Sequence, residues 1–113
     1  LKKTEELSGL GIKDIILDPG FGFGKRTTDN YALLANLESF TEFGMPILVG
    51  TSRKSMICNV LNVAPSEALN GTTVTHTWAL ERGASFLRCH DVKEACQVVE
   101  LHRHLCNSKM NQK

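Results

Sequence analysis

The sequence predicts an α/β fold, and the main reason is the order in which its segments repeat. An apolar run, a polar loop and an amphipathic helical stretch follow one another three times along the chain. The first two apolar runs, Ile15–Leu17 and Ile47–Val49, contain no polar residue, which is typical of strands buried on both faces of a sheet. Strands that alternate with helices form parallel sheets. We therefore expect three parallel strand–helix units, preceded by a helix.

The other elements follow from apolar spacing and from residues that end helices. A third strand is expected at Ala84–Leu87, and it is weaker because Ser85 interrupts its apolar run. Helical spacing runs from Tyr31 to Phe40, and Gly44 stands where glycine commonly ends a helix. The remaining predicted helices are the end of one at residues 1–12, a short one from Pro65, one from Thr72 to Arg82 stopped by Gly83, and one from Asp91.

The last helix carries three specific expectations. Asp91 is predicted to cap its first turn, with Glu94 reaching back to the cap. His102 lies in the apolar stripe of the helix, which favours a packed and hydrogen-bonded histidine over a functional one. The polar tail from Asn107 to Lys113 is expected to fray.

Two architectures satisfy this order of elements: an open doubly wound sheet and part of a (β/α)8 barrel. Three strands alone would leave apolar, unpaired edges, so we expect the chain by itself to be poorly soluble. A closed barrel needs about 250 residues, whereas this chain has 113 and begins with Leu1 rather than Met. These observations predict the C-terminal piece of a barrel, or a chain that completes its sheet with another chain.

The composition excludes several classes of function. A formal net charge of +1 gives no electrostatic reason to expect a nucleic acid or a membrane as partner. No apolar run approaches the roughly 20 residues that span a bilayer. The four cysteines include no Cys-x-x-Cys pair, so we expect free thiols and no zinc site. No secretory leader opens the chain, which favours a cytoplasmic location.

The polar loops after the strands are the candidate site, because ligands bind at the carboxyl ends of the strands in both architectures. The first loop, residues 18–25, fails the spacing of both the P-loop and the dinucleotide-binding loop. Asp18 can accept two parallel N–H bonds from a flat amino-heterocycle, and Phe23 can line an aromatic pocket. The alternative interpretation is a glycine-rich turn with a capping aspartate.

The second and third loops add cationic side chains. In the second, residues 50–55, Lys54 and the hydroxyls can hold an anionic or carbonyl-bearing ligand, although a solvated basic turn gives the same pattern. After the third strand, Arg88 and His90 share one face, because alternate strand residues point the same way. An arginine and a histidine beside a helix N-terminus suit a phosphate or diphosphate. The alternative is an arginine tied to a neighbouring carboxylate.

Together the three segments resemble dihydropteroate synthase. The motifs are LDPGFGFGK at 17–25, LVGTSRKSMI at 48–57 and LRCHDVKEA at 87–95, and the similarity covers essentially the whole chain. The resemblance implies a TIM barrel, with residues 1–113 as the C-terminal segment of its pterin-binding domain and the three strands as strands six to eight. It also implies a transferase of folate biosynthesis. That enzyme condenses p-aminobenzoate with 6-hydroxymethyl-7,8-dihydropterin diphosphate, giving 7,8-dihydropteroate and diphosphate with the help of Mg2+.

The resemblance also assigns roles by position. Asp18 would bind the amino-pyrimidine edge of the pterin. Lys54 would contact the pterin and frame the p-aminobenzoate pocket, which sulfonamides enter as analogues. Arg88 and His90 would hold the diphosphate and, with Lys54, make up the catalytic set. The other substrate-binding residues would be Gly22, Phe23 and Ser55 beside the pockets, Arg53 in the mobile loop above them, and Cys89.

The resemblance leaves parts of the site to other segments. It places the Mg2+ ligands mainly in the missing N-terminal strands and on the substrate diphosphate, and assigns no metal ligand to this chain. We therefore expect the chain alone to be inactive and the parent protein to form a homodimer. Cys89 stands where an aliphatic residue is common, and His76 has no role. The alternatives are the pterin-binding domain of a methyltetrahydrofolate-dependent methyltransferase, or a non-catalytic module that completes a barrel with a partner.

Overall fold

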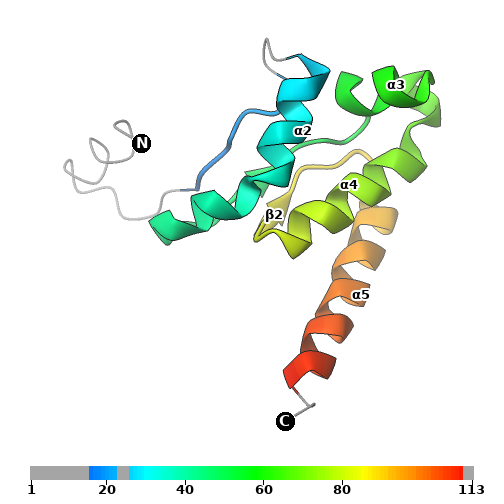
Figure 1. Cartoon of the computed structure of the whole chain (residues 1–113). Coiled ribbons are helices and arrows are strands. Elements are labelled where there is room, and N and C mark those ends of the chain that lie inside the picture. Colours follow the sequence, from blue (N-terminus) through cyan, green and yellow to red (C-terminus); the bar gives the residue numbers. More distant parts are fainter. Residues whose placement is uncertain (1–15, 23–25, 111–113) are drawn as a thin grey trace.

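Helices pack on one face of a small sheet in this computed structural model, which describes residues 16–22 and 26–110 (Figure 1). The last helix, α5, projects away from the rest of the molecule. None of the helices in the described part of the chain is long and apolar enough to cross a membrane. In chain order the elements are α2 (Thr27–Ala35), η1 (Leu37–Phe43), β1 (Leu48–Val49), α3 (Ser55–Leu61), η2 (Pro65–Glu67), α4 (Leu69–Glu81), β2 (Phe86–Leu87) and α5 (Val92–Met110), where η marks a 3-10 helix.

The backbone segments of the sheet run parallel, as predicted. β1 pairs with β2 so that Leu48 lies opposite Phe86. Leu17 forms a parallel bridge with Ile47, and the N–H of Leu48 donates to the carbonyl of Leu17 at 2.8 Å. On the other side of β1, the carbonyl of Val49 accepts from the N–H of Arg88 at 2.9 Å. Because successive backbone groups of a strand point to opposite sides, β1 is the middle segment of the three.

The predicted helix over residues 31–40 is two elements. The α-helix α2 stops at Ala35, and after Asn36 the chain continues as the 3-10 helix η1. The side chain of Asn36 donates to the carbonyl of Ala32 at 2.8 Å, which is the local bonding that makes asparagine a helix-ending residue. Gly44 ends η1 in the left-handed conformation with φ of 68°, so the predicted role of this glycine is confirmed.

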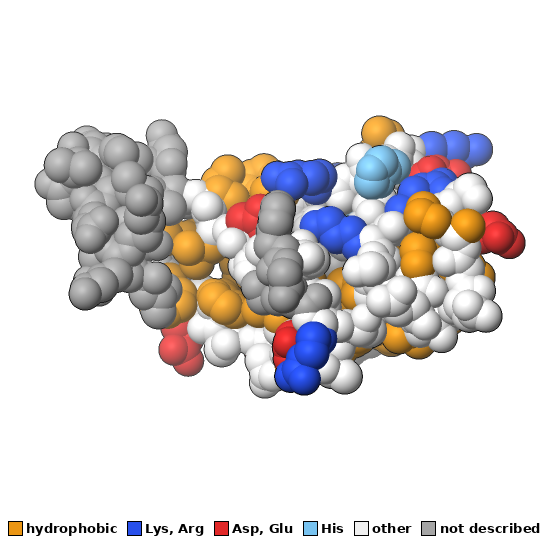
Figure 2. All heavy atoms as spheres, turned by 90° about the horizontal axis from the view of Figure 1, so that it is seen from above, with side chains coloured by type: hydrophobic (Ala, Val, Ile, Leu, Met, Phe, Trp, Pro, Cys, Tyr) orange, Lys and Arg blue, Asp and Glu red, His pale blue; other side chains and the backbone are white. Residues whose placement is uncertain are grey.

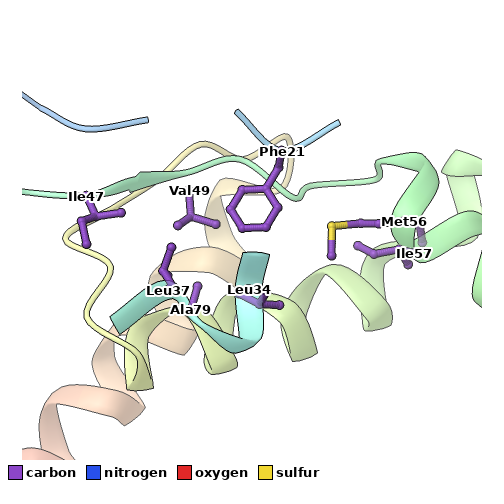
Figure 3. Close-up of a cluster of buried hydrophobic side chains, with 9 residues drawn as sticks. Phe21, Leu34, Leu37, Ile47, Val49, Met56, Ile57 and Ala79 are labelled. Carbon is purple, nitrogen blue, oxygen red and sulfur yellow. The ribbon is translucent and has the colours of Figure 1, made fainter. Parts of the chain in front are cut away.

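The core lies between the sheet and helices α2 and α4. Figure 3 shows Ile47 and Val49 facing Leu34, Leu37 and Ala79 across this layer, with Phe21 beside them. Burial of these side chains is the main force that holds the helices on the sheet. The buried cluster consists of Phe21, Leu34, Leu37, Ile47, Val49, Met56, Ile57, Ala68 and Ala79.

The strands are not buried on both faces, so that prediction is wrong for this chain. In the two runs for which this was predicted, Ile16 is 52% exposed and Leu48 is only half-buried. In the third strand, Phe86 is 47% exposed. The cause is that the described helices cover one face of the sheet only (Figure 3). Ile15, the first residue of the predicted first strand, and the predicted helix at residues 1–12 lie outside the described residues.

Helix α4 begins at Leu69, three residues before its predicted start, and ends before Gly83 as predicted. It follows the short helix η2, which begins at Pro65 as expected. A close approach to α3 occurs at Gly71, where an added Cβ atom would collide with a methyl group of Ile57. The lack of a side chain at this glycine therefore allows α3 and α4 to pack.

Helix α5 packs on α4 only along its first half. Ala95 and Val98 are each 7% exposed, whereas Leu101 and Leu105 are largely exposed. His102 is half-buried and its Nε2 lies 3.5 Å from the sulfur of Cys106, so it is packed less completely than predicted.

The tail from residue 107 was predicted to fray. For residues 107–110 this prediction is wrong, because α5 continues to Met110. Local contacts support this last part of the helix. The hydroxyl of Ser108 donates to the carbonyl of His104 at 3.0 Å, and Glu100 lies within ion-pair distance of Arg103 and His104. Residues 111–113 lie outside the described residues.

Candidate functional site

The three loops that follow the parallel segments meet at one end of the sheet. Parallel segments end on the same side, so the residues after Leu17, after β1 and after β2 are neighbours. On the face shown in Figure 2, Lys and Arg side chains lie beside an acidic side chain near the middle of the view, with a histidine to their right. The site is therefore mainly cationic, with the carboxylates of Asp18 and Asp91 in reach of the cations.

Asp18 and Arg88, from the first and third loops, face each other across this site. One carboxylate oxygen of Asp18 accepts the backbone N–H of Gly20 at 2.9 Å, and the other lies 3.9 Å from Nη2 of Arg88. Both side chains remain well exposed, at 39% for Asp18 and 62% for Arg88. An exposed ion pair at this distance is weak, so a ligand can replace it at little cost.

Lys54 joins this pair from the second loop. Its Nζ donates to the carbonyl of Phe21 at 2.8 Å, and its side chain lies against the backbone of Gly22. Burial lowers the pKa of Lys54 most, the charge of Asp18 raises it, and the charge of Arg88 lowers it. The predicted convergence of these three side chains from three strand ends is what the structure shows.

Asn30 holds the first loop in place and was not singled out from the sequence. It is fully buried in α2, and its Oδ1 accepts the backbone N–H of Gly22 at 2.9 Å. Gly22 has φ of 90°, a conformation that glycine adopts readily and other residues do not. Among the described residues, Nδ2 of Asn30 has no hydrogen-bond partner. The sequence carries no local signal for this contact, because the burial of Asn30 is visible only in the folded chain.

The side chain of Arg53 binds the third loop and the start of η2. Its Nε and Nη2 donate to the two carboxylate oxygens of Asp91 at 2.9 and 2.8 Å, and Nη1 donates to the carbonyl of Pro65 at 2.6 Å. The hydrogen bond from Arg53 is the largest cause that lowers the pKa of Asp91. The predicted cap is thus only partly right. Asp91 precedes α5 and its carbonyl accepts from the N–H of Ala95, but its side chain binds the guanidinium.

Ser52 and His90 form a second link between the same two loops. The hydroxyl oxygen of Ser52 lies 2.8 Å from Nδ1 of His90 and 3.1 Å from the backbone nitrogen of the same residue. Ser52 is 4% exposed, whereas His90 is exposed. The sequence counted Ser52 among the loop hydroxyls but gave it no partner.

His76 lies under the third loop and is 1% exposed. Burial lowers its pKa most, while a hydrogen bond to the backbone of Arg88 and the charge of Asp91 raise it. Its Nε2 has no hydrogen-bond partner in the part of the chain that the structure describes. The histidine without a role in the sequence is therefore a buried support of the Arg88 segment.

The other predicted site residues are placed less centrally. Ser55 is exposed at the first position of α3. Cys89 points to the other side of its segment and lines a groove with Val92 and Cys96 of α5. Phe23 lies outside the described residues, and Phe21 of the same loop belongs to the core.

The arrangement offers complementary groups to one flat, anionic ligand. A carboxylate can accept N–H groups at one end, while a lysine, an arginine and a histidine can donate to oxygen atoms. Within residues 16–22 and 26–110, no group of three or more His, Cys, Asp or Glu side chains could hold a metal ion.

Several known proteins have a sequence similar to that of this chain. The sequence profile of a family described as "Pterin binding enzyme" matches residues 1–90. The chain is 44% identical over 108 residues to the dihydropteroate synthase of Escherichia coli, which covers 96% of this chain and 38% of that protein. It is 39% identical over 100 residues to that of Bacillus subtilis, covering 88% of this chain and 35% of the relative.

Solved structures agree with the sequence comparison. A Yersinia pestis dihydropteroate synthase with a pterine–sulfa conjugate superposes with a TM-score of 0.89 at 40% identity, covering 92% of this chain and 42% of that one. A Xanthomonas albilineans dihydropteroate synthase in complex with 7,8-dihydropteroate gives 0.88 at 36% identity, with the same coverage. The chain spans about two fifths of the length of these relatives, and it belongs to the pterin binding enzyme family.

Proposed function

We propose that this chain is the C-terminal part of a dihydropteroate synthase and that residues 1–113 contribute strands six to eight of its TIM barrel. The observation that carries the proposal is the meeting of Asp18, Lys54 and Arg88 at one end of parallel strands. The ligands of the relatives support it, since their titles name 7,8-dihydropteroate and a pterine–sulfa conjugate. The exposed apolar face at Ile16 and Phe86 supports a sheet that further strands complete.

Asp18 is proposed to bind the pterin. Its carboxylate is held by the N–H of Gly20 and has one oxygen directed toward Arg88, so the side chain is already fixed at the site. A carboxylate accepts two parallel N–H bonds from an amino-pyrimidine edge as it does from a guanidinium group. Lys54, held by the carbonyl of Phe21, donates to the same ligand. Gly22 keeps the backbone close to Lys54 without a side chain in the way.

The diphosphate end is assigned to Arg88 and His90. Arg88 is largely exposed, and its guanidinium lies in a weak ion pair with Asp18 that phosphate oxygens can replace. His90 is exposed beside it in the same loop. The p-aminobenzoate pocket is assigned to Lys54, Phe23 and Ser55. Arg53 is proposed to shape the loop above the pocket through Asp91, and Cys89 completes the substrate-binding set.

These groups fit the chemistry of the reaction. The amine nitrogen of p-aminobenzoate forms a bond to the methylene carbon of the pterin, the bond from that carbon to the diphosphate oxygen breaks, and the amine loses one proton. An arylamine is a free nucleophile at neutral pH and needs no activating triad. The protein must position two substrates and stabilise the charge that develops on the leaving group. Lys54, Arg88 and His90 supply donors for that charge.

Mg2+, which the resemblance implies, is not assigned to residues of this chain. The two carboxylates nearest the site, Asp18 and Asp91, each face an arginine, and the described residues contain no cluster of metal ligands. Mg2+ prefers several oxygen ligands in octahedral geometry. The residues present therefore do not form its site by themselves, and we assign them no step through the metal.

The biological setting is proposed on the same basis. We expect a cytoplasmic enzyme whose parent protein is a homodimer, with sulfonamides competing for the p-aminobenzoate pocket. The titles of relatives that name a sulfonamide drug complex support this last point. The methyltransferase alternative is not favoured, because the similar proteins are named as synthases and the Arg88 and His90 pair suits a diphosphate.

The test joins this chain to the N-terminal part of the E. coli synthase that it does not match, in one polypeptide, and measures dihydropteroate formation. We expect activity from the joined polypeptide and none from the 113-residue chain. Lys54→Met and Arg88→Gln should lower the activity, whereas Arg103→Gln, at an exposed position of α5, should leave it unchanged. A folded joined polypeptide without activity, or activity of the chain alone, would contradict the proposal.

A further inference from the structure

The hydroxyl oxygen of Ser52 contacts two nitrogen atoms of His90, one in the backbone and one in the side chain. Its hydroxyl oxygen accepts the backbone N–H of His90 at 3.1 Å and lies 2.8 Å from Nδ1 of the imidazole. Ser52 is 4% exposed, so water has little access to its hydroxyl group. Among the described residues, both hydrogen bonds of this hydroxyl go to His90.

A count of donors and acceptors fixes the direction of the second bond. A serine hydroxyl has one hydrogen to donate, and its oxygen can accept. The backbone N–H must donate to this oxygen. If Nδ1 also carried a hydrogen and donated, the hydroxyl hydrogen of Ser52 would be buried without an acceptor, which is unfavourable. The hydroxyl therefore donates to Nδ1, and the neutral ring of His90 carries its hydrogen on Nε2.

The segment that carries Ser52 is held on both sides. The hydroxyl of Thr51, on the residue before it, is bonded to the hydroxyl of Thr75 at 2.9 Å, and both side chains are buried. On the residue after it, the backbone N–H of Arg53 donates to Thr72 at 3.0 Å, and the guanidinium binds Asp91. Because Asp91 follows His90 directly, two neighbouring residues of one loop are fixed to two neighbouring residues of the other.

We infer that Ser52 is a positioning residue that holds His90 as the Nε2–H tautomer, with an N–H donor on the exposed side of the ring for the oxygen atoms of a diphosphate. The inference deepens the proposed function and rests on it. The tautomer of a histidine is set by the partner of its other nitrogen, and Ser52 is that partner here. A purely structural serine would have no effect on the position of this hydrogen.

The direct test is nitrogen-15 NMR of the histidine side chains of the joined polypeptide at about pH 8.5, well above the ordinary histidine pKa. His90→Gln identifies the signals of His90 among those of the other histidines. We expect the Nε2–H form in the unchanged protein, a mixture of both tautomers in Ser52→Ala, and the Nε2–H form again in Ser52→Thr, which keeps a hydroxyl. Ser66→Ala, at an exposed position of η2, is the control. An Nδ1–H form in the unchanged protein would overturn the inference, even if Ser52→Ala did not fold.

The second test is titration of the joined polypeptide with inorganic diphosphate. Ser52→Ala should weaken binding about tenfold, the effect of losing one well-placed hydrogen bond to a charged ligand, and Ser52→Thr should restore most of it. Equal binding by Ser52→Ala and the unchanged protein would overturn the role of the tautomer. Absence of diphosphate binding by the unchanged protein, with the Nε2–H form present, would instead count against the proposed function.

Discussion

Arg53 and Asp91 form a bidentate ion pair, with N–O distances of 2.9 and 2.8 Å, between the loops that follow β1 and β2. Arg53 adopts φ of 53°, a left-handed conformation that is uncommon outside glycine. The backbone strain at this position is offset by the hydrogen bonds that its side chain makes. The pair therefore fixes the relative position of the two loops that carry Lys54 and His90.

The ion pair predicts a specific pH dependence of stability. Arg53 lowers the pKa of Asp91 in the folded state, so the unfolded state binds protons more readily at acidic pH. The stabilisation is complete above the unfolded-state pKa of about 4 and is lost as the pH falls through the lower folded-state pKa. Urea unfolding of the joined polypeptide at several pH values should therefore show a steeper loss of stability below about pH 4 for the unchanged protein than for Asp91→Asn.

A matched substitution separates this pair from ordinary surface charge. Glu100 lies 3.9 Å from Arg103 on α5, and both side chains are well exposed. Glu100→Gln should leave the pH dependence close to that of the unchanged protein, since exposed pairs contribute little. If Asp91→Asn behaves like Glu100→Gln at every pH, the ion pair does not fix the two loops.

Replacing Gly71 by alanine, which adds a single methyl group, should lower the stability of the fold. An added Cβ atom would meet Ile57 and also approach Leu61, both on α3. Gly71→Ala should therefore lower the free energy of unfolding by about 1–3 kcal/mol, the usual cost of overpacking, despite the better helix propensity of alanine. Thermal or urea unfolding measures the change. Asn70→Ala, at the preceding exposed position of α4, is the control, and an unchanged stability of Gly71→Ala would contradict the close packing of α3 and α4.

Substitution of Lys54 should weaken the binding of the ligand much more than it lowers the stability of the fold. Lys54→Met keeps the length of the side chain but removes the bond to the carbonyl of Phe21 and the charge beside Asp18. The free energy of unfolding should fall by no more than about 1.5 kcal/mol. This is the upper end of the net contribution of one hydrogen bond to stability, and the lysine is only partly buried. Calorimetric binding of the pterin diphosphate to the joined polypeptide should weaken at least about tenfold. A large loss of stability with unchanged binding would show that Lys54 is structural.

Much of the fold could be predicted from the sequence because apolar runs and helix ends are local signals. The parallel order of the segments, the end of η1 at Gly44 and the start of η2 at Pro65 are all confirmed. The length of α5 was underestimated, since polar residues near its end still form helical contacts. The open face at Phe86 could not be predicted from strand pattern, because burial depends on what covers the strand.

The convergence of the side chains at the candidate site could be predicted from the sequence, whereas the contacts that join its loops could not. Strand ends in a parallel sheet must converge, so Asp18, Lys54 and Arg88 could be grouped from their positions alone. The pairing of Arg53 with Asp91 joins residues 38 positions apart and depends on an unusual backbone angle, so local capping rules gave Asp91 a different partner. No sequence spacing encodes such a pairing.

The central claim is that Asp18 and Arg88 bind opposite ends of one ligand. The most direct measurement is the binding of 6-hydroxymethyl-7,8-dihydropterin, with and without its diphosphate, to the joined polypeptide and to two variants. Asp18→Asn should weaken both ligands at least about tenfold, since it acts on the shared pterin. Arg88→Gln should weaken only the ligand with the diphosphate. Equal effects of Arg88→Gln on both ligands, or no effect of Asp18→Asn on either, would contradict the account.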